Sequence, residues 1–324
     1  MKFIRDNIYQ GISYKAKLGL FLVSLITSIL IMEFLLRFYR IGDDERNLLY
    51  KHHDLLGWFP QKNIKRVFTG SNTIHIQHNN FGFRDKEFIL ESQKKKILIL
   101  GDSFAYGYDS EVGDRFSEIL DNNLENCEIF NLGVSGYSTD QEYLLLKEYF
   151  HLINPDVVYL FYHHNDWGGN SVNHIYNGYY KPYFIYDSGT ESIHLKGVPV
   201  PKSIQHLKYE YPLLYKSKIV IWLTNIFYNN SEEISVNPKI TFELLKEVKS
   251  FVKKNKNTDF KVGIVGNGST PGLIEFLDNE EFDWISIDKD KDKKFFTSTG
   301  HWSKLGNERA AKKMLGHIKI SKKL

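Results

Sequence analysis

One serine in this sequence is placed where it could act as a nucleophile. Ser103 ends the segment Gly101-Asp102-Ser103, which follows four consecutive aliphatic residues, a pattern typical of a short strand buried on both faces of a parallel sheet. A helix is expected over 104–120, so Ser103 would lie between a strand end and a helix start. Unpaired backbone N–H groups there favour developing negative charge. The competing interpretation is that Asp102 or Ser103 only caps the helix.

Three later segments carry further candidate residues. Gly136 lies in a glycine-containing loop after the second expected strand; the loop matches neither common phosphate-binding glycine motif, so we interpret it as offering a bare N–H group. Asn165 and Asp166 follow the third expected strand, and His301 lies near the carboxyl end of the chain. Polar residues thus fall repeatedly where strands end.

An alternation of strands and helices must position these residues. Strands are expected at 97–100, 127–132, 157–162, 260–265 and 284–287, and helices at 104–120, 139–152, 239–254 and after 307. This order is typical of an α/β fold with a parallel sheet and right-handed crossovers.

The amino-terminal region predicts one membrane-spanning helix. Leu18 to Leu36 is a nearly unbroken apolar segment of 19 residues, and basic residues precede it. A cleavable signal peptide is the main alternative, but no small-x-small cleavage site follows, whereas aromatic and arginine residues suited to an interface do. We therefore expect an uncleaved single-pass anchor in the cell membrane, with the amino terminus in the cytoplasm and everything from about residue 41 onward outside the cytoplasm.

The expected organisation has four parts. They are a cytoplasmic amino terminus at 1–17, a transmembrane helix at 18–38, a small β-rich lead-in at 41–93 and a main domain at 94–324 with an insertion at about 168–235. In the lead-in, 73–77 alternates like a strand. In the insertion we expect a hairpin around 187–189 and a packed helical segment at 219–227. The insertion also contains tyrosines that could either stack on sugar rings or pack in the core: Tyr179, Tyr180, Tyr183 and Tyr186.

Composition and residue counts argue against several classes of protein and of binding site. With 324 residues, 42% hydrophobic and 25% charged, the chain can bury a full α/β domain, and a net charge of +3 gives no support for nucleic-acid binding. The lone Cys127 excludes intramolecular disulfides. His52, His53, His75 and His78 lack the spacing of metal ligands, so we expect neither a metal nor a cofactor.

Taken together, the Gly-Asp-Ser segment, Gly136, Asn165 and His301 resemble the SGNH hydrolase superfamily, also called GDSL-like esterases. The order and spacing of these four blocks fit over about residues 95–320. The apolar helix and an Asn-x-x-Gly-Phe-Arg element at 79–84 resemble its membrane-anchored bacterial members. The resemblance implies a flavodoxin-like three-layer α/β/α fold.

The resemblance also implies roles. Ser103 would attack an ester carbonyl and His301 would accept its proton and return it to the leaving alcohol. The oxyanion would be held by the N–H groups of Ser103 and Gly136 and by the Asn165 amide. The α/β-hydrolase motif G-x-S-x-G is absent, since position 105 is Ala.

Two positions depart from the family pattern. His163 stands where a glycine is usual, and Ser298 and Thr299 stand where the family carries the Asp that orients the histidine. Three alternatives remain open: a Ser-His dyad aided by a backbone carbonyl, an acid supplied by Asp288, Asp290 or Asp292, or a protein that binds without turnover.

The expected function is therefore a membrane-anchored serine esterase or O-acyltransferase acting on short acyl esters, in particular acetyl esters of envelope or exported polysaccharide. The alternatives are a lipid ester hydrolase and a non-catalytic glycan-binding or assembly protein on the same fold. The sequence leaves protein partners open.

Overall fold

The computed structural model describes residues 13–39, 49–69, 71–175, 179–203, 206, 210–228, 236–266, 270–287 and 292–320. The chain divides into two compact units. The smaller comprises Met1–Asp44 and Leu207–Asn230, and the larger comprises Glu45–His206 and Ser231–Leu324.

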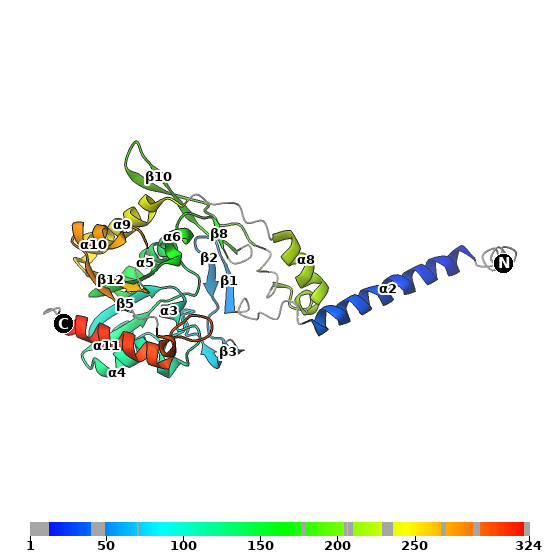
Figure 1. The fold of residues 1–324 in the computed structure, drawn as a ribbon, viewed down its shortest axis with the longest axis horizontal. Coiled ribbons are helices and arrows are strands. Elements are labelled where there is room, and N and C mark those ends of the chain that lie inside the picture. Colours follow the sequence, from blue (N-terminus) through cyan, green and yellow to red (C-terminus); the bar gives the residue numbers. More distant parts are fainter. Residues whose placement is uncertain are drawn as a thin grey trace. The chain divides into compact units, whose positions relative to one another are not determined.

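A five-stranded sheet organises the larger unit (Figure 1). Its strands are all parallel and run in the order β13-β12-β7-β5-β6. Their bounds are Lys95–Gly101 for β5, Cys127–Asn131 for β6, Val157–His163 for β7, Asp259–Val265 for β12 and Asp283–Ser286 for β13. All five expected strands are confirmed to within two residues at each end.

Helices cover both faces of this sheet (Figure 1). Leu98 and Leu100 of β5 belong to a core with α5 (Thr139–Ile153), α9 (Pro238–Lys256) and α10 (Leu273–Asn279). Ile97 and Ile99 belong to a second core with α4 (Phe116–Asn123) and α11 (Lys304–Ile320). Because alternate residues of a strand point to opposite faces, one apolar run supplies both cores. The three-layer α/β fold is therefore confirmed.

One expected element is wrong. Instead of a single helix over 104–120, the chain forms α3 (Ser103–Tyr106), the 3-10 helix η2 (Val112–Asp114) and then α4. Gly107 ends α3 with a positive φ of 74°, and a Cβ at this position would lie 2.4 Å from Cδ of Arg115. A side chain could not be accommodated without movement, so the glycine fixes the break. The break creates a loop over 107–111.

The lead-in consists of two antiparallel hairpins. Strand β1 (Tyr50–His53) pairs with β2 (Gly57–Pro60), and β3 (Lys65–Thr69) pairs with β4 (Thr73–Gln77), which confirms the strand expected at 73–77. Trp58 and Phe83 from this region are buried in the same core as the sheet. The lead-in therefore packs as part of the larger unit.

Two further hairpins follow β7 and the short helix α6 (Asn165–Gly169). They pair β8 (His174–Ile175) with β9 (Tyr179–Tyr180), and β10 (Tyr183–Asp187) with β11 (Ser192–Lys196), so the hairpin expected near 187–189 is confirmed. Tyr179 is buried against Trp58 and cannot present its face to a ligand. Among the four tyrosines considered for stacking, this one belongs to the core.

The smaller unit contains α2 (Tyr14–Phe38) and α8 (Lys218–Tyr228), with the 3-10 helix η4 (Leu214–Lys216) before α8. Helix α2 has 25 residues and no buried side chain, and its most apolar window has a mean hydropathy of 2.3. At 1.5 Å per residue it is about 37 Å long, enough to cross a bilayer. A signal sequence near an amino terminus would have the same length and composition.

Candidate active site

Ser103 lies at the junction that its sequence predicts. It is the first residue of α3, directly after the central strand β5, and Asp102 caps this helix by accepting a bond from Phe104 N–H at 2.9 Å. The serine side chain is almost buried. Ser103, the predicted nucleophile, thus lies on a capped strand-to-helix turn.

His301 approaches Ser103 from the loop before α11. Its Nε2 lies 2.7 Å from Ser103 Oγ, although 198 positions separate the two residues. The loop is fixed by Thr297 N–H donating to the His301 carbonyl at 2.8 Å and by the buried Trp302. The Tyr108 ring stacks on the imidazole with centroids 4.3 Å apart. The structure therefore brings together the two residues predicted to carry out the chemistry.

A carboxylate that sequence reasoning missed lies behind the imidazole. Nδ1 of His301 is 2.8 Å from Thr299 Oγ1, and the Thr299 hydroxyl donates to Oδ2 of Asp109. The Asp109 side chain is fully buried, and its Oδ2 lies 3.9 Å from His301 Nδ1. The acid that would orient the histidine thus comes from the loop after the nucleophile and reaches the ring through a hydroxyl.

The hydrogen-bond directions in this chain select one histidine tautomer. An ionised carboxylate only accepts, so the single Thr299 hydroxyl hydrogen goes to Asp109, and Thr299 Oγ1 must accept from His301 Nδ1–H. Nε2 is then unprotonated and faces the Ser103 hydroxyl. The arrangement can take the proton from the serine without any rearrangement.

Of the three carboxylates proposed from the sequence, the structure describes only Asp292. Asp288 and Asp290 lie outside the described residues. Asp292 caps the 3-10 helix η5 (Lys293–Phe295) and pairs with Lys294 at 2.9 Å. The one sequence feature that points toward Asp109 is Gly107, which permits a turn shortly after Ser103.

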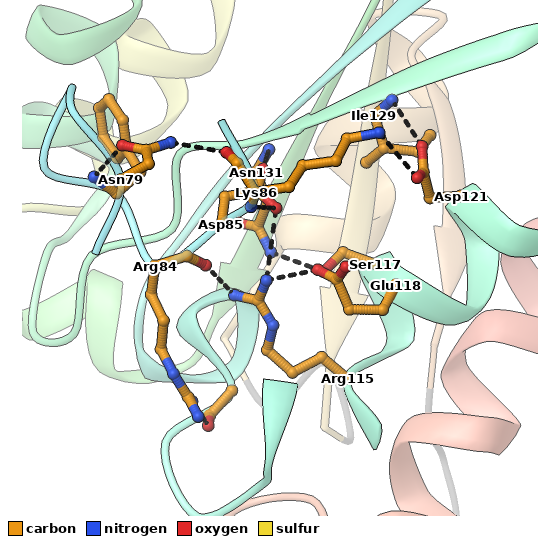
Figure 2. A network of polar contacts seen from close by, with 12 residues as sticks. Asn79, Arg84, Asp85, Lys86, Arg115, Ser117, Glu118, Asp121, Ile129 and Asn131 are labelled. Atoms are coloured by element: carbon orange, nitrogen blue, oxygen red, sulfur yellow. Dashed lines mark hydrogen bonds and ion pairs between the residues drawn. The ribbon is translucent and has the colours of Figure 1, made fainter. Parts of the chain in front are cut away.

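Buried arginines hold the loop that carries Asp109. The Arg84 guanidinium donates to the carbonyls of Gly107 at 2.5 Å and Ser110 at 2.7 Å, which flank Asp109. Burial lowers the pKa of Arg84 to about 10, so it stays cationic at neutral pH. Figure 2 shows Arg115 donating in turn to the Arg84 carbonyl. Through Arg84, the Asn-x-x-Gly-Phe-Arg element at 79–84 thus holds the loop over 107–111 in place.

Two carboxylates of this network balance the positive charge of Arg115. Its guanidinium lies between the carboxylates of Asp85, at 3.5 Å, and Glu118, at 2.5 Å (Figure 2). Asp85 also accepts from the backbone N–H of Asn131 at 2.8 Å, and the Asn131 amide donates to the Ala105 carbonyl at 2.8 Å. The lead-in, β6 and α3 are therefore joined by one buried polar network.

Asn165 is oriented by the residue that departs from the family pattern. Nδ1 of His163 lies 2.8 Å from Asn165 Oδ1, and Asn165 Nδ2 donates to Asp102 at 3.1 Å. With its oxygen occupied by the imidazole, the amide presents its nitrogen on the side of the nucleophile turn. Burial raises the pKa of Asp102, but the His163 imidazole and the Asn165 amide, with a backbone N–H, outweigh it and hold the pKa below its ordinary value.

A cavity of about 350 Å³ opens beside these groups. Gly136 and Asn165 line it together with the apolar side chains of Val172, Ile175 and Val236. Gly136 has a positive φ of 87°, and its N–H has no acceptor among the residues that the structure describes. Two of the three residues predicted to hold an oxyanion thus share one cavity wall.

No protein-family model and no curated protein matches this chain. Solved structures do resemble it. A member of the lipolytic protein G-D-S-L family from Veillonella parvula is 14% identical, with 71% of this chain and 100% of that chain covered and a TM-score of 0.41. The psychrotrophic esterase EstA from Pseudoalteromonas sp. is 10% identical, with coverages of 70% and 98% and a TM-score of 0.42. A lipase/acylhydrolase from Enterococcus faecalis is 13% identical, with coverages of 69% and 95% and a TM-score of 0.40. These similarities are distant and assign no activity to this chain.

Proposed function

We propose that this protein is a serine esterase or acyltransferase with Ser103 as nucleophile and His301 as general base. The observation that carries the proposal is the continuous hydrogen-bond chain from Ser103 Oγ through the two imidazole nitrogens and the Thr299 hydroxyl to the buried Asp109 carboxylate. A hydroxyl needs an adjacent base to become nucleophilic at neutral pH, and the base needs a partner for its second nitrogen.

The reaction proceeds through an acyl-enzyme. Ser103 Oγ bonds to the ester carbonyl carbon as its proton passes to Nε2 of His301, and the carbonyl oxygen becomes an oxyanion. The C–O bond to the leaving alcohol then breaks, and His301 returns the proton to that alcohol. Water, or an acceptor hydroxyl in a transferase, then attacks the acyl-Ser103 ester as His301 takes its proton. The bond between the acyl carbon and Ser103 Oγ breaks, and His301 returns the proton to Ser103 Oγ.

The oxyanion would be held by three donors: the N–H groups of Ser103 and Gly136 and the Asn165 amide. The Asn165 amide has a second hydrogen beyond the one donated to Asp102. Losing one donor of this kind typically costs about 3 kcal/mol of transition-state stabilisation. Asp109 stabilises the imidazolium that forms when His301 is protonated.

The proposed substrate is a short acyl ester, in particular an acetyl ester, of envelope or exported polysaccharide. The support is the apolar helix α2, which as an uncleaved anchor would expose the larger unit to the cell envelope, together with two half-buried tyrosine rings. They are Tyr180 on β9, which pairs with the cavity-lining strand β8, and Tyr183 on β10. A topology reporter fused after Leu324 tests the anchor: we expect activity outside the cytoplasm, and activity only inside would contradict it.

A specific observation favours a second candidate, lipid ester hydrolysis. The cavity wall that contains Gly136 and Asn165 continues into Val172, Ile175 and Val236, a surface that suits an acyl chain. The two candidates therefore differ in what occupies this cavity.

A cavity-filling variant separates them. Gly168 lines the cavity, and a Cβ added there would meet no atom within 4 Å, so this position can carry a side chain intended to fill the cavity. If the cavity holds an acyl chain, Gly168→Leu lowers hydrolysis of p-nitrophenyl octanoate and spares the acetate. Gly316→Leu, equally open but on α11, is the control. Preference for octanoate, with unchanged glycan acetylation in cells carrying Ser103→Ala, would leave the lipid function.

A further inference from the structure

Helix α8 of the smaller unit lies within an apolar stretch, residues 211–228, that contains no acidic residue. From Tyr211 to Tyr228 the only charged residues are Lys216 and Lys218. Leu213 is 80% exposed before η4, and Ile226 is 51% exposed on α8. The sequence predicted a packed helical segment here, and Ile221 is indeed buried, but other large apolar side chains face outward. Exposed apolar surface of this kind marks an interaction site.

A carboxylate of the apolar helix α2 binds the start of α8. Glu33 accepts from the backbone N–H groups of Lys218 at 2.8 Å and Ile219 at 3.1 Å. It also accepts from the Ser217 hydroxyl at 2.9 Å. These bonds satisfy helix-start donors that otherwise need a partner.

Arg37 completes this contact. It pairs with Glu33 at 2.8 Å and donates to the Lys216 carbonyl at 2.6 Å. The charge of Glu33 is thus paired near the carboxyl-terminal end of α2, where an isolated carboxylate in an apolar helix would be costly. We define Glu33, Arg37 and residues 216–219 as the α2–α8 clamp.

We propose that the α2–α8 clamp joins α8 to the carboxyl-terminal end of the anchor helix α2 and that residues 211–226 form a second membrane contact, lying in the interface of a phospholipid bilayer. Helix α8 has 11 residues and is about 16 Å long, too short to cross a hydrocarbon core of about 30 Å. It is tied to the end of a helix that is long enough to span.

The chemistry of the stretch fits a lipid surface. Leu213, Leu214 and Ile226 offer apolar side chains for the acyl boundary, while Lys216 and Lys218 can reach headgroup phosphates. The absence of acidic residues across 211–228 avoids repulsion from those phosphates. The inference rests on the anchoring proposed above, and it adds the second contact.

Fluorescent labelling of the full-length chain tests the proposal. Cys127 is the only cysteine, so a Cys127→Ala background allows single labels at Leu213→Cys or Ile226→Cys. A polarity-sensitive dye is read in vesicles of phosphatidylethanolamine and phosphatidylglycerol, with and without lipids carrying a quencher near the headgroup. Ile185→Cys, an exposed apolar position on β10, is the matched control.

We expect a blue-shifted emission and loss of fluorescence with the quencher at 213 and 226, and neither at 185. Water-like emission without quenching at both 213 and 226 would overturn the second contact. The intact mass of the membrane-extracted protein tests the premise separately: a mass that includes residues 1–38 supports the retained anchor, and a mass lacking them refutes it.

Discussion

The role of Asp109 can be tested by breaking the hydrogen-bond chain at two successive points. Asp109→Asn removes the carboxylate charge while conserving shape. Thr299→Val removes the hydroxyl that connects the imidazole to that carboxylate, and Thr299→Ser retains it. If the hydrogen-bond chain acts as a unit, Asp109→Asn and Thr299→Val lower turnover and Thr299→Ser does not.

The structure sets the size of the effect. Asp109 Oδ2 lies 3.9 Å from His301 Nδ1, so the attraction between carboxylate and imidazolium is about 4 kcal/mol at an effective dielectric constant of about 20 and about 1 kcal/mol in water. Because the carboxylate is fully buried, the larger figure applies, and Asp109→Asn should lower kcat by about 10²- to 10³-fold. Thr299→Val removes one bond to an ionised group, about 1.5–3 kcal/mol, or roughly 10- to 100-fold.

The assay is kcat and KM for p-nitrophenyl acetate with the full-length chain in detergent, accompanied by thermal unfolding of each variant. The unfolding control is needed because Asp109 also accepts from Thr297 at 2.7 Å. The double variant Asp109→Asn/Thr299→Val should lose little more kcat than the worse single variant, because both substitutions interrupt the same hydrogen-bond chain. Adding Thr299→Asp to Asp109→Asn should restore much of the activity by placing a carboxylate beside the ring.

Two results would refute this reasoning. One is a folded Asp109→Asn variant with kcat within a factor of about three of wild type, which would mean the carboxylate contributes less than about 0.7 kcal/mol. The other is strictly additive losses in the double variant, which would mean that Thr299 and Asp109 act independently.

Three further predictions concern the scaffold. Burial lowers the pKa of His78 to about 4 in the folded protein, whereas the unfolded chain has the ordinary value of about 6.5. Between these two pH values the unfolded chain therefore binds a proton that the folded protein does not. The contribution of His78 to the free energy of unfolding should therefore fall by up to about 3 kcal/mol between pH 6.5 and pH 4, and the difference between wild type and His78→Gln in urea titrations at several pH values should show this fall. Arg84→Met should destabilise the fold by about 3 kcal/mol or more, because several buried carbonyls lose their donor. Chemical denaturation measures this loss, and unchanged stability would contradict the role given to Arg84 in holding the loop over 107–111. Gly107→Ala should cost about 1–3 kcal/mol in thermal unfolding and also lower kcat, because the loop carrying Asp109 must shift, whereas Gly113→Ala, with open space around it, should do neither.

The sheet could be predicted because its strands are marked by composition. Runs such as Ile97 to Leu100 and Val157 to Tyr162 are apolar on every residue and short, which is typical of a strand covered on both faces. Ser103 and His301 could be predicted because each stands in a short motif beside such an element. Their approach to 2.7 Å then follows from the topology.

Asp109 could not be predicted in the same way. It lies in an irregular loop, and its contact with Thr299 spans 190 positions and depends on how Gly107 turns the chain. Periodicity carries no information about such a loop, and we expected one continuous helix over 104–120. The role of His163 was equally hidden, because only the folded site shows its ring beside the Asn165 amide.

The most direct test of the central claim is covalent labelling of Ser103 by a fluorophosphonate, read by intact mass and peptide mapping of the full-length protein. We expect rapid modification at Ser103 alone, none in Ser103→Ala and a large loss of rate in His301→Ala. A folded wild-type protein that is not modified, or that reacts equally fast without His301, would contradict the account and favour a non-catalytic binding protein.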